Sequence, residues 1–205
     1  TGDCFIRVPA DSRLVLRSVK ITGPHNLYMK GYQSGAADSS IVIRDSTISV
    51  GKNMYITAGR RTTTGYSPRA RLLIVNSFLR GDLLGLSASV DKKNGSVVVL
   101  DSKLVGREAS VLIWASTKDR YDGIARIQRN EVKSANDIAV QTGRRGTTTV
   151  TANELTADDD LQVISGYKGT TTFRKNTLSV DDETVKAGAG GTCVATNNTP
   201  AVSCA

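Results

Sequence analysis

The sequence has little of several residue types that mark specialised classes of protein. Its 205 residues include 4 prolines, 3 cysteines, 1 histidine and 1 tryptophan, and aromatic side chains make up 5% of the chain. So few cysteines exclude a small disulfide-dense scaffold, and there is no nearby set of Cys and His ligands for zinc. Apolar runs such as 72–75 and 97–100 are far too short to cross a bilayer. We therefore expect no membrane span.

The remaining composition is typical of a basic folded domain. Apolar residues make up 39% of the chain and charged residues 22%, and the formal net charge is +8. This mixture is too apolar for a disordered chain. A length near 200 residues is enough to bury a substantial core. We expect a single domain over residues 1–205.

An internal repeat is the strongest pattern in the sequence. Six segments read apolar-x-x-Ser/Asn-x-apolar, and two more are degenerate copies. The clear copies are 43–48, 74–79, 99–104, 127–132, 150–155 and 173–178, and the degenerate ones are 16–21 and 194–199. Their last positions lie 21 to 31 residues apart. A unit of this length cannot bury its own apolar face, so it must stack on its neighbours.

Each repeat also contains a second short apolar segment. Examples are 27–29, 54–56, 138–140 and 161–163, in which apolar residues alternate with period two. That period indicates strands and not helices. The sequence therefore predicts an all-β solenoid of about seven coils, with loop insertions that account for the variable interval.

The pattern resembles the right-handed parallel β-helix of the pectate-lyase-like superfamily, over roughly residues 14–199. In that family an Asn often occupies the tight turn between the second and third strands, and its side chains stack from coil to coil. Asn130, Asn153, Asn176 and Asn197 match this place, and Ser46, Ser77 and Ser102 take it in the earlier coils. Asn suits the turn because it tolerates a left-handed backbone and its amide can extend a hydrogen-bonded ladder. The resemblance concerns the fold, since no catalytic motif of the family is matched.

The ends of the chain are expected to close the solenoid. Residues 1–13 are predicted to form an N-terminal cap region and residues 188–205 a C-terminal cap. Cys193 and Cys204 enclose ten residues, a spacing that can close a small terminal loop. We favour a disulfide here over two unpaired thiols, with Cys4 left over. A disulfide predicts an oxidising location: secreted, periplasmic, or on a cell or virion surface.

Basic residues and tyrosines gather in the loops that follow the first strand of each coil. The candidate ligand-binding residues are Tyr28, Tyr55, Arg60, Arg61, Tyr66, Lys92, Lys93, Lys118, Arg120, Tyr121, Arg144, Arg145, Tyr167 and Lys168. Aromatic rings beside Arg and Lys suit sugars that carry carboxylates, sulfates or phosphates, and they also suit nucleic acid. In the resembling family this strand and its loops form the carbohydrate groove, which favours the sugar.

Acidic residues gather in the opposite turns toward the C-terminus. Alignment by the repeat predicts a column of Asp137, Asp160 and Glu183, beside stacked pairs at 158/181 and 159/182. Carboxylates one strand spacing apart need a cation or a raised pKa. Oxygen-rich clusters favour Ca²⁺, and carboxyl pairs about 5 Å apart are used in glycoside hydrolysis. Ordinary solvated turn residues are the simpler interpretation.

Three functions are left open by these patterns. The first is a secreted or surface-exposed binding module, adhesin-like or tailspike-like, that holds an acidic polysaccharide or another polyanion along the Tyr/Lys/Arg edge. The second is a polysaccharide lyase or glycoside hydrolase that uses the acidic turns, with calcium as the one candidate cofactor. The third is a purely structural rod. Nucleic acid remains a less favoured polyanion.

Overall fold

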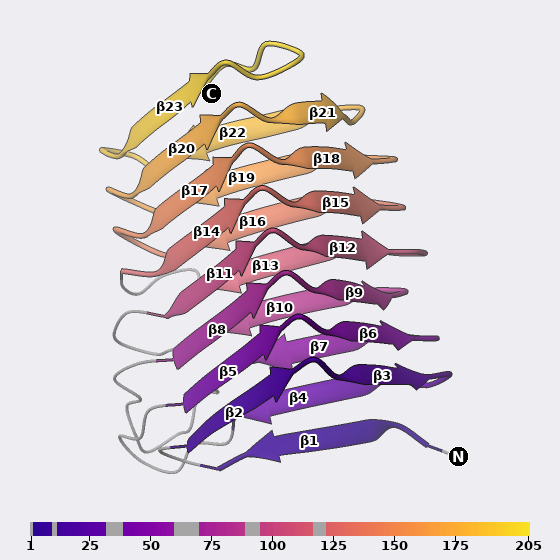
Figure 1. The fold of residues 1–205 in the computed structure, drawn as a ribbon. Helices are drawn as coiled ribbons and strands as arrows, with labels where there is room; N and C mark the ends of the chain where they lie inside the picture. Colours follow the sequence, from indigo (N-terminus) through magenta and orange to yellow (C-terminus); the bar gives the residue numbers. More distant parts are fainter. Residues whose placement is uncertain (1, 10–11, 32–38, 60–69, 89–94, 117–121) are drawn as a thin grey trace.

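The structure is a computed structural model, and it describes residues 2–9, 12–31, 39–59, 70–88, 95–116 and 122–205. Every regular element in these ranges is a β-strand, and the 23 strands form three parallel sheets, here called A, B and C. Figure 1 shows the strands stacked in coils along one axis, from the N-terminus at the bottom to the C-terminus at the top. Within the described ranges, no helix is long and apolar enough to cross a membrane.

Each coil contributes one strand to each sheet. Sheet A contains β1 (Cys4–Val8), β4 (Leu27–Gly31), β7 (Met54–Thr57), β10 (Leu84–Ala88), β13 (Val111–Ala115), β16 (Ile138–Thr142), β19 (Leu161–Ser165) and β22 (Glu183–Ala187). Sheet B contains β2 (Ser12–Arg17), β5 (Ser39–Arg44), β8 (Ala70–Val75), β11 (Ser96–Leu100), β14 (Ile124–Gln128), β17 (Thr147–Thr151), β20 (Thr170–Arg174) and β23 (Thr192–Thr196). Sheet C contains β3 (Lys20–Gly23), β6 (Thr47–Val50), β9 (Phe78–Gly81), β12 (Lys103–Gly106), β15 (Glu131–Ser134), β18 (Glu154–Ala157) and β21 (Thr177–Ser179).

This architecture confirms the predicted all-β parallel β-helix. The strands make seven complete coils of three strands. An incomplete eighth coil, β22 and β23, follows them, so the coil count differs slightly from the expected seven. Three junctions define the surface of the rod. We call them the A–B edge, the B–C corner and the C–A edge, after the sheets that the chain joins there.

The core follows from the period-two alternation of the strands. In one coil Val150 of β17, Leu155 of β18 and Val163 of β19 point inward and are at most 2% exposed. Residues in the same register of the neighbouring coils extend each column, as Ile127 and Phe173 do on either side of Val150. Every coil therefore covers the apolar face of the next, which is why a single repeat cannot fold alone.

The B–C corner contains the predicted ladder, with one correction in the last coil. Asn130, Asn153 and Asn176 are buried and bond in sequence through their side chains, at 3.0 Å for each of the first two steps. The next rung is Asn198 and not Asn197, because the amide Nδ2 of Asn176 donates to Oδ1 of Asn198 at 3.1 Å. The alignment was wrong by one residue because two asparagines are adjacent there, and the chain places Asn197 outside the ladder.

The reason for Asn in the ladder also differs from the expectation. The left-handed backbone belongs to the residue just before each rung. These residues are Ser18, Asp45, Asn76, Asp101, Arg129, Ala152, Lys175 and Asn197, with φ between 46° and 57°. The rung itself is selected for the hydrogen bonds of its side chain. A serine hydroxyl or an Asn amide therefore serves, as Ser46, Ser77 and Ser102 show.

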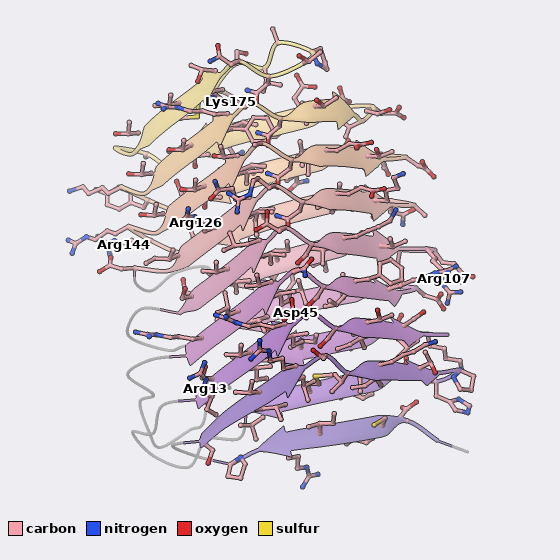
Figure 2. All side chains as sticks on the ribbon, viewed as in Figure 1. Arg13, Asp45, Arg107, Arg126, Arg144 and Lys175 are labelled. Carbon is pink, nitrogen blue, oxygen red and sulfur yellow. A yellow bond between two sulfur atoms is a disulfide. The ribbon has the colours of Figure 1, made fainter. Side chains whose placement is uncertain are left out.

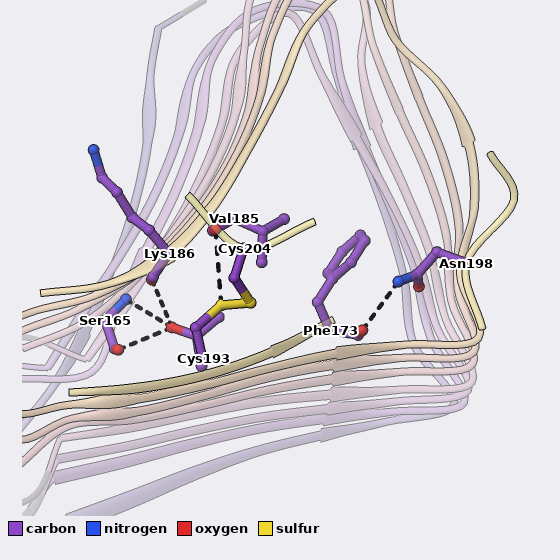
Figure 3. Close-up of a disulfide and its surroundings, with 8 residues drawn as sticks. Ser165, Phe173, Val185, Lys186, Cys193, Asn198 and Cys204 are labelled. Carbon is purple, nitrogen blue, oxygen red and sulfur yellow. Dashed lines mark hydrogen bonds between the residues drawn. A yellow bond between two sulfur atoms is a disulfide. The ribbon is translucent and has the colours of Figure 1, made fainter. Parts of the chain in front are cut away.

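A disulfide closes the C-terminal end, as predicted. Cys193 in β23 is bonded to Cys204, and their Cα atoms lie 6.0 Å apart. Figure 3 shows this bond folding the final segment over the last coil, beside Phe173 and Val185. The Ala205 N–H donates to the Val185 carbonyl at 3.0 Å, and Val202 packs against the core.

The first coil belongs to the same stack. Strand β1 pairs in parallel with β4, and β2 pairs with β5. Its inward residues Ile6, Leu14 and Leu16 are only partly buried, since they have a neighbouring coil on one side only. Cys4 is exposed and is not in a disulfide.

Candidate functional site

The predicted ligand-binding residues divide into two groups. Eight of them lie outside the described residues: Arg60, Arg61, Tyr66, Lys92, Lys93, Lys118, Arg120 and Tyr121. The structure describes the other six, Tyr28, Tyr55, Arg144, Arg145, Tyr167 and Lys168. It places the last four of these together at the A–B edge.

Three tight turns stack at the A–B edge in the C-terminal coils. The turns are 143–146, 166–169 and 188–191, and each begins and ends with glycine. In each turn the N–H of the final glycine donates to the carbonyl of the first, at 3.0, 2.8 and 2.9 Å. The turns also bond to one another, since the Arg145 N–H donates to the Tyr167 carbonyl at 2.8 Å. The backbone therefore holds the residues between the glycines in fixed register.

The glycines are required because the turns touch. A Cβ on Gly166 would lie 2.7 Å from the carbonyl carbon of Gly143, and one on Gly188 would lie 2.5 Å from that of Gly166. The third residue of each turn has a left-handed backbone, with φ of 57° at Arg145 and 53° at Lys168. Such a φ costs a non-glycine residue energy, so the surrounding hydrogen bonds must stabilise it.

The side chains of these turns form a cationic cluster around one aromatic ring. The Arg144 guanidinium carbon lies 4.9 Å from the centre of the Tyr167 ring, and the Lys168 ammonium lies 5.3 Å from it. Tyr167 itself is 43% exposed. Figure 2 shows Arg144 extending from the A–B edge away from the rod. Among the described residues, no carboxylate forms an ion pair with Arg144, Arg145 or Lys168.

Tyr28 and Tyr55 lie elsewhere, on the outer face of sheet A near the N-terminal end. Phe5, Tyr28 and Tyr55 stack in that order, with ring centres 4.8 and 5.5 Å apart and planes within 10° of parallel. The ammonium of Lys30 lies 4.9 Å from the centre of the Tyr28 ring. Both faces of Tyr28 are therefore covered by its neighbours. Tyr28 therefore presents its edge and hydroxyl, whereas the sequence interpretation required an open ring face for a sugar.

The acidic turns lie at the C–A edge, and their predicted column needs a correction. Asp137 and Asp160 do occupy equivalent places, because β16 pairs with β19 in that register. The third place belongs to Asp182 and not to Glu183, which pairs with Leu161 inside strand β22. The predicted pairs shift as well, since the Asp181 N–H donates to the Asp159 carbonyl. Leu155 and Leu161 pair with Leu178 and Glu183, so the later coil has one residue fewer between these two places. A constant repeat interval conceals that deletion.

Asp137, Asp159 and Asp160 are close enough to hold one ion. Each offers a carboxylate oxygen, and these oxygens lie within 4.8 Å of one another. Loss of hydration raises the pKa of the Asp160 carboxyl, and the charges of Asp159, Asp137, Asp182 and Asp181 raise it further. Oxygen ligands of this kind suit Ca²⁺, so these three residues could hold that ion.

The sequence interpretation missed a groove at the B–C corner. It has a volume of about 650 Å³ and runs across four coils. Its lining consists of the residues before, at and after three serine rungs, and of the two that flank Asn130: Asp45, Ser46, Thr47, Asn76, Ser77, Phe78, Asp101, Ser102, Lys103, Arg129 and Glu131. The two variable positions that flank the Ser/Asn of the repeat could have indicated it, because both point outward at a corner.

Most charges of this groove are already paired. The Arg129 guanidinium donates to both oxygens of Asp101, at 2.6 and 2.7 Å, and this bond lowers the pKa of the Asp101 carboxyl. Glu131 accepts from Lys103 at 2.7 Å and pairs with Lys133 at 2.9 Å; hydrogen bonds from the two ammonium groups lower its pKa. The groove therefore offers less uncompensated charge than the A–B edge does.

Comparison of the chain with protein-family models, with curated proteins and with solved structures finds no match in any of the three. The fold alone defines the class, which is a parallel β-solenoid protein of the β-helix type.

Proposed function

We propose that this protein is a β-solenoid binding module that holds an acidic polysaccharide or a similar polyanion at the A–B edge. One observation carries the proposal. Arg144 and Lys168 lie against the exposed Tyr167 ring, and Arg145 lies in the same stacked turns. None of the three cations forms an ion pair with a described carboxylate. Cations that are left without partners on a rigid support attract and orient an anion.

The geometry favours a chain-like ligand over a single small anion. Successive turns are spaced by one coil, about 4.8 Å along the axis. Arg145 and Lys168 occupy equivalent places in two such turns. Anionic groups that repeat along a polymer can therefore meet a cation in each coil. The exposed part of Tyr167 adds an apolar surface against which a sugar ring can pack.

A compartment outside the cytosol fits this function. The Cys193–Cys204 disulfide is stable in oxidising surroundings, where extracellular polysaccharides also occur. The proposal therefore includes secretion, or display on a periplasmic, cell or virion surface.

Binding should be measured against polygalacturonate, alginate and heparin, with neutral dextran as a reference. We expect the acidic polymers to bind and binding to weaken with salt, since exposed charges act over about 8–10 Å at physiological ionic strength. Charge reversal in R144E/R145E should lower affinity for the best polymer at least tenfold.

The matched control is R174E/K175E, which reverses the same charge in the neighbouring coil but on sheet B and at the B–C corner. Lys175 shares the left-handed backbone of Arg145, with φ of 54° against 57°, so both variants carry the same local strain. Equal losses in the two variants would mean diffuse attraction to net charge, and the proposed site would be wrong. Tyr167→Ala should weaken binding to sugar chains more than binding to inorganic polyphosphate.

A second candidate function rests on the acidic turns. Retaining glycoside hydrolases place two carboxyl groups about 5–5.5 Å apart, and the acid of the pair has a raised pKa. Oxygens of Asp137 and Asp160 lie within 4.8 Å, and the pKa of Asp160 is raised. In this hypothesis Asp160 donates the proton to the leaving oxygen and Asp137 stabilises the sugar cation. New reducing ends from a polysaccharide panel, absent with Asp160→Asn, would support hydrolysis, and unsaturated ends would support a lyase.

A calcium site in the same turns is tested separately. A ligand that binds only the folded chain stabilises it. Millimolar Ca²⁺ should then raise the melting temperature, chelator should reverse the gain, and Asp160→Asn should abolish it. If Ca²⁺ does not change the melting temperature, these residues are ordinary solvated turn residues and do not form a calcium site.

A further inference from the structure

The outer face of sheet A carries exposed apolar and aromatic side chains along much of its length. Phe5 is 59% exposed and Trp114 is 45% exposed. Between and beyond them the face presents Tyr28, Tyr55, Leu112 and Ile164, which are partly exposed. Two outward rows share these side chains: Phe5, Tyr28, Tyr55 and Leu112 in one, and Trp114 and Ile164 in the other. Large apolar groups that gather on one face mark an interaction surface more often than scattered ones do.

The two borders of this face have opposite charges in the C-terminal coils. The A–B edge presents Arg144, Arg145 and Lys168. The C–A edge presents Asp137, Asp158, Asp159, Asp160, Asp181 and Asp182. None of these nine residues forms an ion pair within the part of the chain that the structure describes. Figure 2 shows the two edges on opposite sides of the rod, with Arg144 at one and Arg107 at the other.

The acidic and basic groups also lie at the same height along the rod. Asp137 directly precedes β16, and Arg144 lies in the turn that follows it. In the same way Asp160 directly precedes β19, and Lys168 lies in the turn that follows that strand. One strand of five residues separates each pair, about 16 Å. They are too far apart to neutralise each other within one copy.

A second copy of the chain supplies the missing partners through a simple rotation. A two-fold axis that runs along the rod, between two facing sheets A, exchanges the C–A edge with the A–B edge. The acidic turns of one copy then lie opposite the basic turns of the other, coil by coil. The same rotation exchanges the second and fourth residues of each strand, so Leu112 faces Trp114 of the second copy and Tyr28 faces Lys30 of the second copy.

We infer that the outer face of sheet A is a self-association surface on which two rods pack in parallel, joined by the acidic turns of each against the basic turns of the other. This surface contains the basic residues of the proposed polyanion site but does not depend on polyanion binding. A polyanion and the second copy compete for Arg144 and Arg145.

The size of the face sets the expected strength. Eight strands about 4.8 Å apart and about 16 Å wide give a face of ~550 Å², or ~1,100 Å² for two copies. That area is at the lower limit of specific interfaces. The dimer should therefore be weak and dependent on protein concentration and salt, because much of its specificity comes from charge.

A charge-swap experiment tests the arrangement directly. Variant D159K/D160K/D181K/D182K is basic at both edges, because its four lysines outnumber the two remaining aspartates of the C–A edge. Variant R144E/R145E is acidic at both edges. Sedimentation velocity at low salt, from micromolar to submillimolar protein, should show native dimers and at least a tenfold loss of self-association for each variant alone. An equimolar mixture of the two should form heterodimers, because each variant edge then meets its complement.

Two further measurements separate association from misfolding. Trp114 is the only tryptophan in the chain, so its fluorescence should shift to shorter wavelength as dimers form and in the mixture of variants. R174E/K175E, which changes sheet B and the B–C corner, should associate as the native chain does. A native protein that stays monomeric throughout, or a mixture that does not associate, would overturn the inference. No polysaccharide is present, so failure of polyanion binding leaves this result unaffected.

Discussion

The N-terminal and C-terminal coils use the same backbone path but hold it with different side chains. In the early coils the rungs at the B–C corner are serines. The Ser77 N–H donates to Ser102 at 3.1 Å, and the Ser77 hydroxyl donates to Val75 of its own strand. In the later coils the rungs are asparagines. Asn153 donates through Nδ2 to Ile127 in the coil before and to Asn176 in the coil after, each at 3.0 Å.

The difference shows how many coils one side chain connects. A serine side chain joins two coils, because its hydroxyl accepts an N–H from the coil before but donates within its own coil, as Ser77 does with Ser46 and Val75. An asparagine joins three, because its amide reaches both neighbours while its oxygen accepts from the coil before. The later coils also bury hydroxyl groups near the A–B edge, where Thr142 and Thr148 bond at 3.0 Å. The register partners of Thr142 and Thr148 in the coil before are the alanines Ala115 and Ala125. The later coils are therefore joined by more buried hydrogen bonds.

The largest expected effect is at the ladder. Asn153→Leu should lower the free energy of unfolding by about 3 kcal/mol, because it leaves the buried Ile127 carbonyl and the Asn130 amide without partners. Ser77→Ala should cost about 1 kcal/mol, since one intercoil bond is lost. Urea unfolding of both variants measures the difference. Equal costs would contradict the distinction between three-coil and two-coil rungs.

The disulfide comes next, and it distinguishes the two ends of the rod. Replacing Cys193 and Cys204 by serine should lower stability by about 3 kcal/mol, as expected for a closed loop of this length. Cys4→Ser is the control, and it should leave the melting temperature unchanged because Cys4 is exposed and unbridged. If the double variant has the same melting temperature as the native protein, the terminal segment does not close the C-terminal end.

A smaller effect is expected at Asp160, in the acidic C-terminal turns. Its raised pKa means that the folded chain binds this proton more tightly than the unfolded chain does. Stability from this group therefore rises as the pH falls through the folded pKa and is lost as the pH rises. Asp160→Asn should raise the melting temperature at pH 7 without Ca²⁺, and the gain should vanish as the pH falls below the unfolded pKa of 3.8. A loss of stability at pH 7 would contradict the assigned repulsion.

The smallest effect is expected at Asp101, on the groove. Its hydrogen bonds from Arg129 lower its pKa, so their contribution is present above the unfolded pKa and is lost as the pH falls through the folded one. Asp101→Asn should therefore reduce stability slightly at neutral pH and have no effect in strong acid. The sign is opposite to that of Asp160→Asn, and identical pH profiles would refute both assignments.

The sequence was sufficient for the fold because strand period and repeat spacing are local properties. The pattern around Asn130, Asn153 and Asn176 locates both strands and the turn between them. It fails where the spacing changes by one residue, as at Asp182 and Asn198, because adjacent identical or similar residues fit either register. Only three-dimensional packing decides which one points inward.

The candidate site was predicted less completely, for a different reason. Sequence shows that Arg144 and Tyr167 follow equivalent strands, but it does not show whether an aromatic ring has a free face. Tyr28 and Tyr55 were expected to offer theirs, but Phe5 and Tyr55 cover the two faces of Tyr28, and Tyr28 covers one face of Tyr55. The groove at the B–C corner was missed because the residues that flank each rung vary in type from coil to coil and share only their place.

The left-handed residues of the B–C corner have one more consequence. The same backbone conformation is occupied there by serine, aspartate, asparagine, arginine, alanine and lysine, so the fold does not depend on which side chain is present. The corner therefore presents one variable residue per coil, at intervals of about 4.8 Å. Charges or hydrogen-bonding groups can vary at these positions without a change in the core. A polymer whose repeat matches that interval would then meet one such group in each coil.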